Sequence, residues 1–116
     1  MTEEEARGIV YNDLGLCGCG EPEQVLRFVH KALELIKKRL ESDWCKESQA
    51  EIDQHFCSEE SEKDNLFRWI AWYFIDRAGL IEHGSNIRNS WLTEKGKTFL
   101  QYLDAHALTQ ILETQS

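Results

Sequence analysis

Residues 66–103 decide the fold predicted for this chain, and they read LFRWIAWYFIDRAGLIEHGSNIRNSWLTEKGKTFLQYL. The first part is an apolar run that predicts a helix over about 63–78. Gly79 is expected to end this helix, because glycine reaches the left-handed backbone region without steric cost. Two short alternating segments follow, 80–83 and 90–93, and the turn-forming residues between them predict a β-hairpin. Thr93 then predicts the N-cap of a last helix.

The predicted helix over 63–78 is apolar almost all round, so it is expected to pack closely into the core. Its inner face is expected to carry six apolar side chains, those of Leu66, Phe67, Ile70, Tyr73, Phe74 and Ile75. The remaining face then carries Asn65, Arg68, Trp69, Trp72 and Asp76. Whichever of Arg68 and Trp72 faces solvent would indicate the kind of partner that this helix binds.

Three further helices are expected upstream of this stretch. Apolar residues at three- and four-residue spacing predict a long helix from Pro22 to about Leu40, and proline suits a first helical turn. Shorter helices are expected over about 3–12 and 46–57. Residues 13–20 contain three glycines and predict a tight, irregular loop before the long helix.

The length of 116 residues predicts a single domain, and 41% hydrophobic residues is enough to build a core. We expect an N-terminal arm with the glycine-rich loop over 1–21, a core over 22–106 and a C-terminal helical extension over 107–116. The acidic N-terminus lacks the apolar region of a signal peptide, and no apolar run approaches the ~20 residues that span a bilayer. A cytoplasmic protein without membrane contact is therefore expected.

The phrases Gly79-Leu80-Ile81-Glu82 and Leu92-Thr93-Glu94-Lys95-Gly96 resemble the second half of winged helix-turn-helix domains. The resemblance is to the bacterial MarR-like regulators and to small prophage-encoded winged-helix proteins. It covers about a third of the chain. It implies a mainly α fold with a small antiparallel β-wing, with the helix before Gly79 in the position of the DNA-recognition helix and Arg88 near the tip of the wing.

Two classes of function follow from these residues, and both lack catalysis. A DNA-binding transcription regulator would use Asn65, Arg68, Arg88, Lys95 and Lys97. A protein-interaction module would use Trp69 and Trp72, since tryptophan and arginine dominate binding hot spots. The resemblance favours DNA, whereas the net charge of −8 opposes attraction to phosphates. Against both, the two tryptophans can simply bury against neighbouring helices.

A weaker alternative is zinc binding. Cys17, Cys19, His55 and Cys57 would supply four soft ligands if their two segments met in space. Their spacing is not that of a standard zinc finger, and we expect idle or buried thiols and no bound cofactor. Finally, the apolar residues within 107–116 predict a C-terminal helix that either caps the core or pairs with a second subunit as a homodimer.

Overall fold

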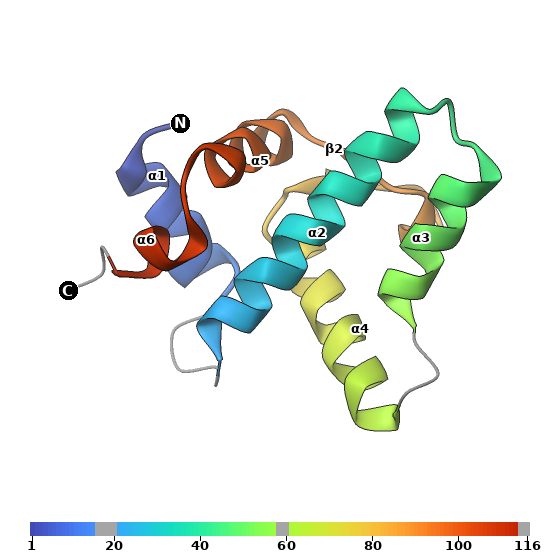
Figure 1. The fold of residues 1–116 in the computed structure, drawn as a ribbon, viewed down its shortest axis with the longest axis horizontal. Coiled ribbons are helices and arrows are strands. Elements are labelled where there is room, and N and C mark those ends of the chain that lie inside the picture. Colours follow the sequence, from blue (N-terminus) through green and yellow to red (C-terminus); the bar gives the residue numbers. More distant parts are fainter. Residues whose placement is uncertain (16–20, 58–60, 114–116) are drawn as a thin grey trace.

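The computed structural model describes residues 1–15, 21–57 and 61–113, and Figure 1 shows their arrangement. The helical elements are α1 (Glu3–Gly8), the π-helical turn η1 (Ile9–Asp13), α2 (Pro22–Glu41), α3 (Lys46–Phe56), α4 (Glu62–Arg77), α5 (Glu94–Ala105) and α6 (Leu108–Glu113). Two antiparallel strands, β1 (Ile81–Glu82) and β2 (Trp91–Leu92), flank the 3-10 turn η2 (Ile87–Asn89). The predicted class, mainly α with a small antiparallel β element, is confirmed.

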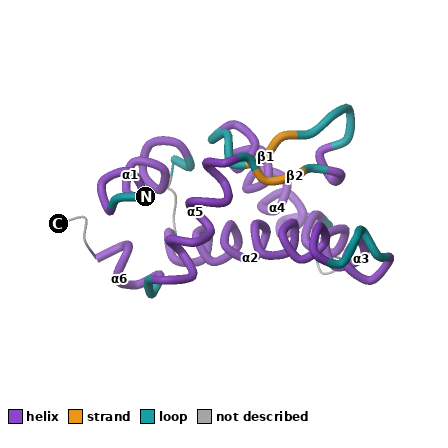
Figure 2. Tube along the Cα trace, turned by 90° about the horizontal axis from the view of Figure 1, so that it is seen from above, coloured by secondary structure: helices purple, strands orange, loops and turns teal. Residues whose placement is uncertain are grey.

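Helix α2 is the element around which the others pack, and Figure 2 shows it running along the length of the molecule. It contacts α3, α4, α5, α6 and β2. Most of its predicted apolar stripe is buried, with Leu26, Val29, Leu33 and Ile36 at the centre of the core, whereas Leu40 near the end of the helix is exposed. Among the described residues, no helix has both the length and the apolar content needed to cross a membrane.

The rotation of α4 differs from the prediction. Trp72 is fully buried, and its indole stacks on Phe56 of α3 with ring centroids 4.0 Å apart. The indole Nε1–H donates to the carbonyl of His55, which satisfies the one polar atom of this side chain. Leu66, Ile70 and Tyr73, which were assigned to the inner face, are exposed instead. Because α4 is apolar on nearly every side, the spacing of its residues did not decide which face is buried.

The corner between α4, β1 and α5 is built by the two phrases that carried the resemblance. Gly79 ends α4 with φ +77°, as predicted. The hydroxyl of Thr93 donates to the carbonyl of Gly79 (2.6 Å) and accepts from the backbone N–H of Gly96 (3.0 Å), so it caps α5 and ties it to the corner. Gly96 lies so close to the carbonyl of Leu80 that a side chain there would overlap that backbone.

Both strands are shorter than the predicted segments 80–83 and 90–93, and the turn η2 occupies part of the segment between them. The side chain of Asn86 accepts from the N–H of Arg88 and starts this turn. The buried guanidinium of Arg39 on α2 donates to the carbonyls of Arg88 and Ser90 and to Oε1 of Gln49. One α2 side chain therefore links the segment between the strands to α3.

Both ends of the described chain pack onto the core. Ala6, Ile9, Val10 and Leu14 are buried, so residues 1–15 belong to the core instead of forming an arm outside it. The C-terminal extension forms α6, separated from α5 at His106, and α6 packs on α2 with Ile111 buried. Of the two roles predicted for this extension, the described residues show the capping of the core, and dimerisation through α6 gains no support.

We predict that Gly96→Ala destabilises the protein. In a helix, alanine is ordinarily favoured over glycine by about 1 kcal/mol. Here the added methyl group overlaps the carbonyl of Leu80, which is backbone and can move only together with the corner. The expected net effect is a loss of about 1–3 kcal/mol in the free energy of unfolding, measured by urea titration.

The matched control for this change is Gly84→Ala. A methyl group at position 84 meets nothing within 4 Å, so the variant should unfold within about 0.5 kcal/mol of the natural chain. If Gly96→Ala were as stable as the natural chain, the close approach of α5 to β1 would not be the constraint described above.

Candidate functional site

Arg68 and Trp72, the two α4 residues expected to distinguish the partner classes, both point inward. Trp72 is part of the core. The guanidinium of Arg68 pairs with Asp64 (2.8 Å) and donates to the carbonyls of Gln54 and His55 at the end of α3. These carbonyls lack partners within their own helix, so Arg68 acts as a C-terminal cap for α3.

The other predicted cations also have intramolecular partners. Lys95 contacts Asp13 (2.8 Å) and the carbonyl of Ala78, and so joins α5 to η1 and to the end of α4. Lys97 lies 3.3 Å from Glu94 on its own helix. The guanidinium of Arg88 lies 3.8 Å from the carboxylate of Asp53 on α3. Asn65, on α4, is half-buried.

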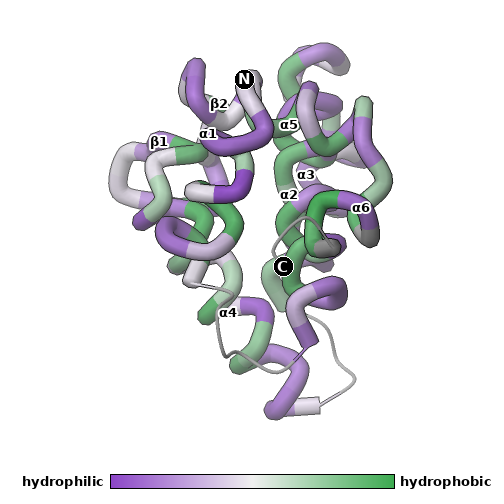
Figure 3. Tube along the Cα trace, turned by 90° about the vertical axis from the view of Figure 1, so that its left-hand side faces the viewer, coloured by the Kyte–Doolittle hydropathy of each residue, from purple (hydrophilic) through white to green (hydrophobic). Residues whose placement is uncertain are grey.

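The outward face of α4 carries four apolar side chains in a row. They are Leu66 (61% exposed), Trp69 (46%), Ile70 (47%) and Tyr73 (60%), and they are called the α4 stripe here. Spacings of three and four residues place them on one side of the helix. In Figure 3, α4 lies in the lower part of the molecule, below the hairpin, and its trace carries both hydrophobic (green) and hydrophilic (purple) residues.

The side chain of Trp69 packs against two neighbouring side chains, those of Phe56 and Arg88. Its ring packs edge-on against Phe56, with centroids 5.6 Å apart. The guanidinium of Arg88 lies 5.9 Å from the Trp69 ring and 5.4 Å from that of Phe56. The predicted residues Trp69 and Arg88, 19 positions apart in the sequence, are therefore neighbours, and Trp69 is a half-exposed aromatic side chain with restricted freedom.

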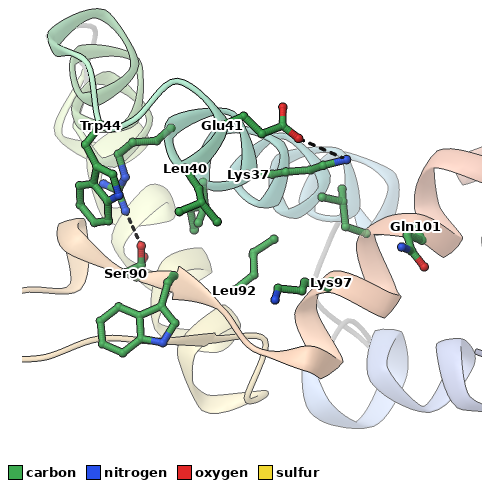
Figure 4. Close-up of a pocket in the computed structure, with 12 residues that line it drawn as sticks. Lys37, Leu40, Glu41, Trp44, Ser90, Leu92, Lys97 and Gln101 are labelled. Atoms are coloured by element: carbon green, nitrogen blue, oxygen red, sulfur yellow. Dashed lines mark hydrogen bonds and ion pairs between the residues drawn. The ribbon is translucent and has the colours of Figure 1, made fainter.

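A second apolar surface is the groove between the end of α2, β2 and the start of α5, shown in Figure 4. Its volume is about 510 Å³, and its apolar lining comprises Ile36, Leu40, Trp44, Trp91, Leu92 and Leu100. The lysines at its edge lie near carboxylates, Lys37 at 3.9 Å from Glu41 and Lys97 near Glu94. The third cation of the lining, Arg39, donates to backbone carbonyls, so the groove offers mainly apolar contact.

One cluster of possible metal ligands joins α2 to α5. His30 Nε2 lies 3.0 Å from Glu34 and 2.7 Å from Asp104, and the three groups are within 4.8 Å of one another. The imidazole bridges two exposed carboxylates, which accounts for the arrangement as a link between the helices. No further feature of the described residues points to a metal at this position.

Of the four weak zinc candidates, the structure describes His55 and Cys57. Cys17 and Cys19 lie outside the described residues. His55 stacks on Phe28 with ring centroids 3.9 Å apart, and its Nε2 lies 3.1 Å from the Phe28 carbonyl. Cys57 is exposed at the end of α3. His55 is therefore accounted for as a packed histidine between α2 and α3.

The sequence interpretation missed three of the four stripe residues, because Leu66, Ile70 and Tyr73 were assigned to the core. The available signal was the number of apolar positions on α4, which exceeds what one buried face needs. That excess indicates a second apolar face, but which residues form it depends on where Trp72 packs.

A scan of protein-family models, a search of curated proteins and a search of solved structures each found no match to this chain.

The packed state of His55 predicts a pH dependence of stability. Burial lowers the pKa of His55 to about 4, the nearby charge of Arg68 acts in the same direction, and the hydrogen bond to Phe28 opposes them. Between about pH 6.5 and pH 4 the unfolded chain binds a proton that the folded chain excludes. The free energy of unfolding should therefore fall as the pH drops through this window.

The measurement is urea unfolding of the natural chain and of His55→Phe at several pH values from 7 to 4. The phenylalanine keeps the stacked ring but cannot titrate, so its stability should fall less over this window. The control is His83→Gln, because the hydrogen bond to Asp76 raises the pKa of His83 and its effect has the opposite sign. Equal pH slopes for His55→Phe and the natural chain would contradict the assignment.

Proposed function

We propose that this chain is a non-catalytic winged-helix module that binds a protein partner through the α4 stripe. The observation that carries the proposal is the exposure of Leu66, Trp69, Ile70 and Tyr73 side by side on one helix. A contiguous apolar patch on a protein surface is typical of an interaction site. An amphipathic helix face of this kind is a common element of protein–protein recognition.

The order of the elements supports the winged-helix part of the proposal. Helices α2, α3 and α4 are followed by the β1–β2 hairpin and then by α5. In this interpretation α4 occupies the position of the recognition helix, and the hairpin is the wing. The corner formed by Gly79, Thr93 and Gly96 gives the resemblance a physical basis, because each of these residues has a defined backbone role there.

The surface of α4 supports a protein partner over DNA. Base edges are read by hydrogen-bonding side chains such as arginine, lysine, asparagine and glutamine, whereas the stripe offers mainly apolar groups. Arg68, Arg88, Lys95 and Lys97 each lie within 4 Å of a carboxylate of the same chain. The net charge of −8 adds a general repulsion from phosphates.

Trp69 is the expected anchor of the interaction. Binding hot spots are enriched in tryptophan that lies in a well-packed position near the centre of an interface. Trp69 lies in the middle of the stripe and is backed by Phe56 and Arg88. Less side-chain entropy is therefore lost when a partner covers it than for a freely rotating side chain.

We expect a photo-crosslinking amino acid at position 70 to form a discrete covalent adduct in the cells that produce the chain. The matched control carries the same amino acid at position 110 on α6, which is also exposed but lies away from α4 (Figure 1). The adduct from position 70 should disappear when Tyr73→Glu is added, because a charge in the stripe opposes apolar burial. The readout is the mass of the adduct on a denaturing gel.

Failure to form an adduct from position 70, or an adduct that survives Tyr73→Glu, contradicts the proposal. Duplex DNA provides the opposing test, by fluorescence anisotropy at low salt. We expect no saturable binding. Saturable binding that weakens with salt and is lost on Arg88→Ala would favour the DNA-binding regulator instead.

A further inference from the structure

On one side of α4, the exposed residues have the same spacing when they are counted from either end of the helix. These residues are Glu62, Leu66, Trp69, Ile70, Tyr73 and Arg77, with spacings of four, three, one, three and four, and the exposed Lys63 lies just outside this side of the helix. The midpoint falls between Trp69 and Ile70. Reflection about that midpoint exchanges Leu66 with Tyr73 and Trp69 with Ile70, and it exchanges the negative Glu62 with the positive Arg77.

These six residues share one side of the helix. At about 100° of rotation per residue, all six lie within about 50° of a common direction. The same rotation places the buried Trp72 and Ile75 well outside this sector. The symmetric pattern is therefore a property of the solvent-facing surface and not of the residues that build the core.

A two-fold symmetric pair of chains needs this kind of self-complementary surface, since the same patch is used by both copies. With two α4 helices antiparallel, Leu66 of one copy meets Tyr73 of the other, and the Trp69–Ile70 pairs meet at the centre. Glu62 of one copy then lies near Arg77 of the other, twice per dimer. A parallel arrangement would bring like charges together at both ends.

The charges at the ends of the stripe are available for such pairing. Within the described residues, neither Glu62 nor Arg77 has an ion-pair partner in its own chain, whereas Arg68, Lys95 and Lys97 do. Both residues are exposed. Among the residues that the structure describes, each end of the stripe thus carries an exposed charge without an ion-pair partner, and in the antiparallel arrangement a second copy supplies the opposite charge at each end.

We propose that the partner of the α4 stripe is a second copy of this chain, bound with the two α4 helices antiparallel about a two-fold axis between Trp69 and Ile70. This inference rests on the proposed function and names its partner. Four apolar side chains from each copy form a small interface. The dimer is therefore in equilibrium with the monomer and depends on concentration.

The test is sedimentation equilibrium over a wide range of protein concentration at low salt. The weight-average mass of the natural chain should rise from 13.6 kDa toward twice that value. Ile70→Glu should remain monomeric, because it places two like charges beside the two-fold axis. Position 70 is exposed, so helix content and thermal unfolding of this variant should match those of the natural chain.

Charge exchange tests the antiparallel arrangement. Glu62→Arg alone and Arg77→Glu alone each place like charges opposite one another at both ends of the dimer, and each should weaken association roughly tenfold. An equimolar mixture of the two variants restores opposite charges at both ends when the copies differ. The mixture should therefore associate about as tightly as the natural chain.

Two results from the sedimentation experiment would overturn the inference: a natural chain that stays monomeric at every concentration, or a dimer that Ile70→Glu leaves intact. A mixture of Glu62→Arg and Arg77→Glu that associates no more tightly than either variant alone would also overturn it. The cross-link from position 70 distinguishes failure of the dimer proposal from failure of the proposed function. An adduct of twice the chain mass supports both the interaction module and the second copy as its partner. An adduct with a different protein, together with a monomeric natural chain, retains the interaction module and rejects the second copy.

Discussion

The burial of Trp72 between α2 and α3 is the interaction on which the surface of this protein depends. Its ring stacks on Phe56, lies edge-on to Phe28 and donates to the carbonyl of His55, so both the apolar area and the one polar atom are satisfied. These contacts determine the rotation of α4. Once Trp72 faces inward, Leu66, Ile70 and Tyr73, which lie about 100° or more from it around the helix axis, face solvent.

A second feature of the structure is the internal use of its cations. Arg39 fastens the hairpin to α2, Arg68 caps α3, and Lys95 joins α5 to η1 and α4. Each of these side chains supplies donors to backbone carbonyls, whose burial without partners costs free energy. Residues that suggested nucleic-acid binding in the sequence therefore contribute to the fold, and the surface that remains for a partner is apolar.

Local signals were predicted well because they depend on a few neighbouring atoms. Gly79 has the left-handed backbone expected of it, and Thr93 caps α5. The break between α5 and α6 and the short η2 turn were not predicted. Both elements lie against α2: α6 packs on it, and Arg39 of α2 binds the carbonyl of Arg88 in η2.

The sequence by itself determined where the main helices lie, how three of them begin or end, and that α4 has more apolar residues than one buried face requires. Only the tertiary structure decided which of those residues are buried. The reason is physical: a helix that is apolar on nearly every side can pack in several rotations. The choice among them follows from the shapes of Phe28, Phe56 and Trp72 and from the carbonyl of His55, which come from three different helices.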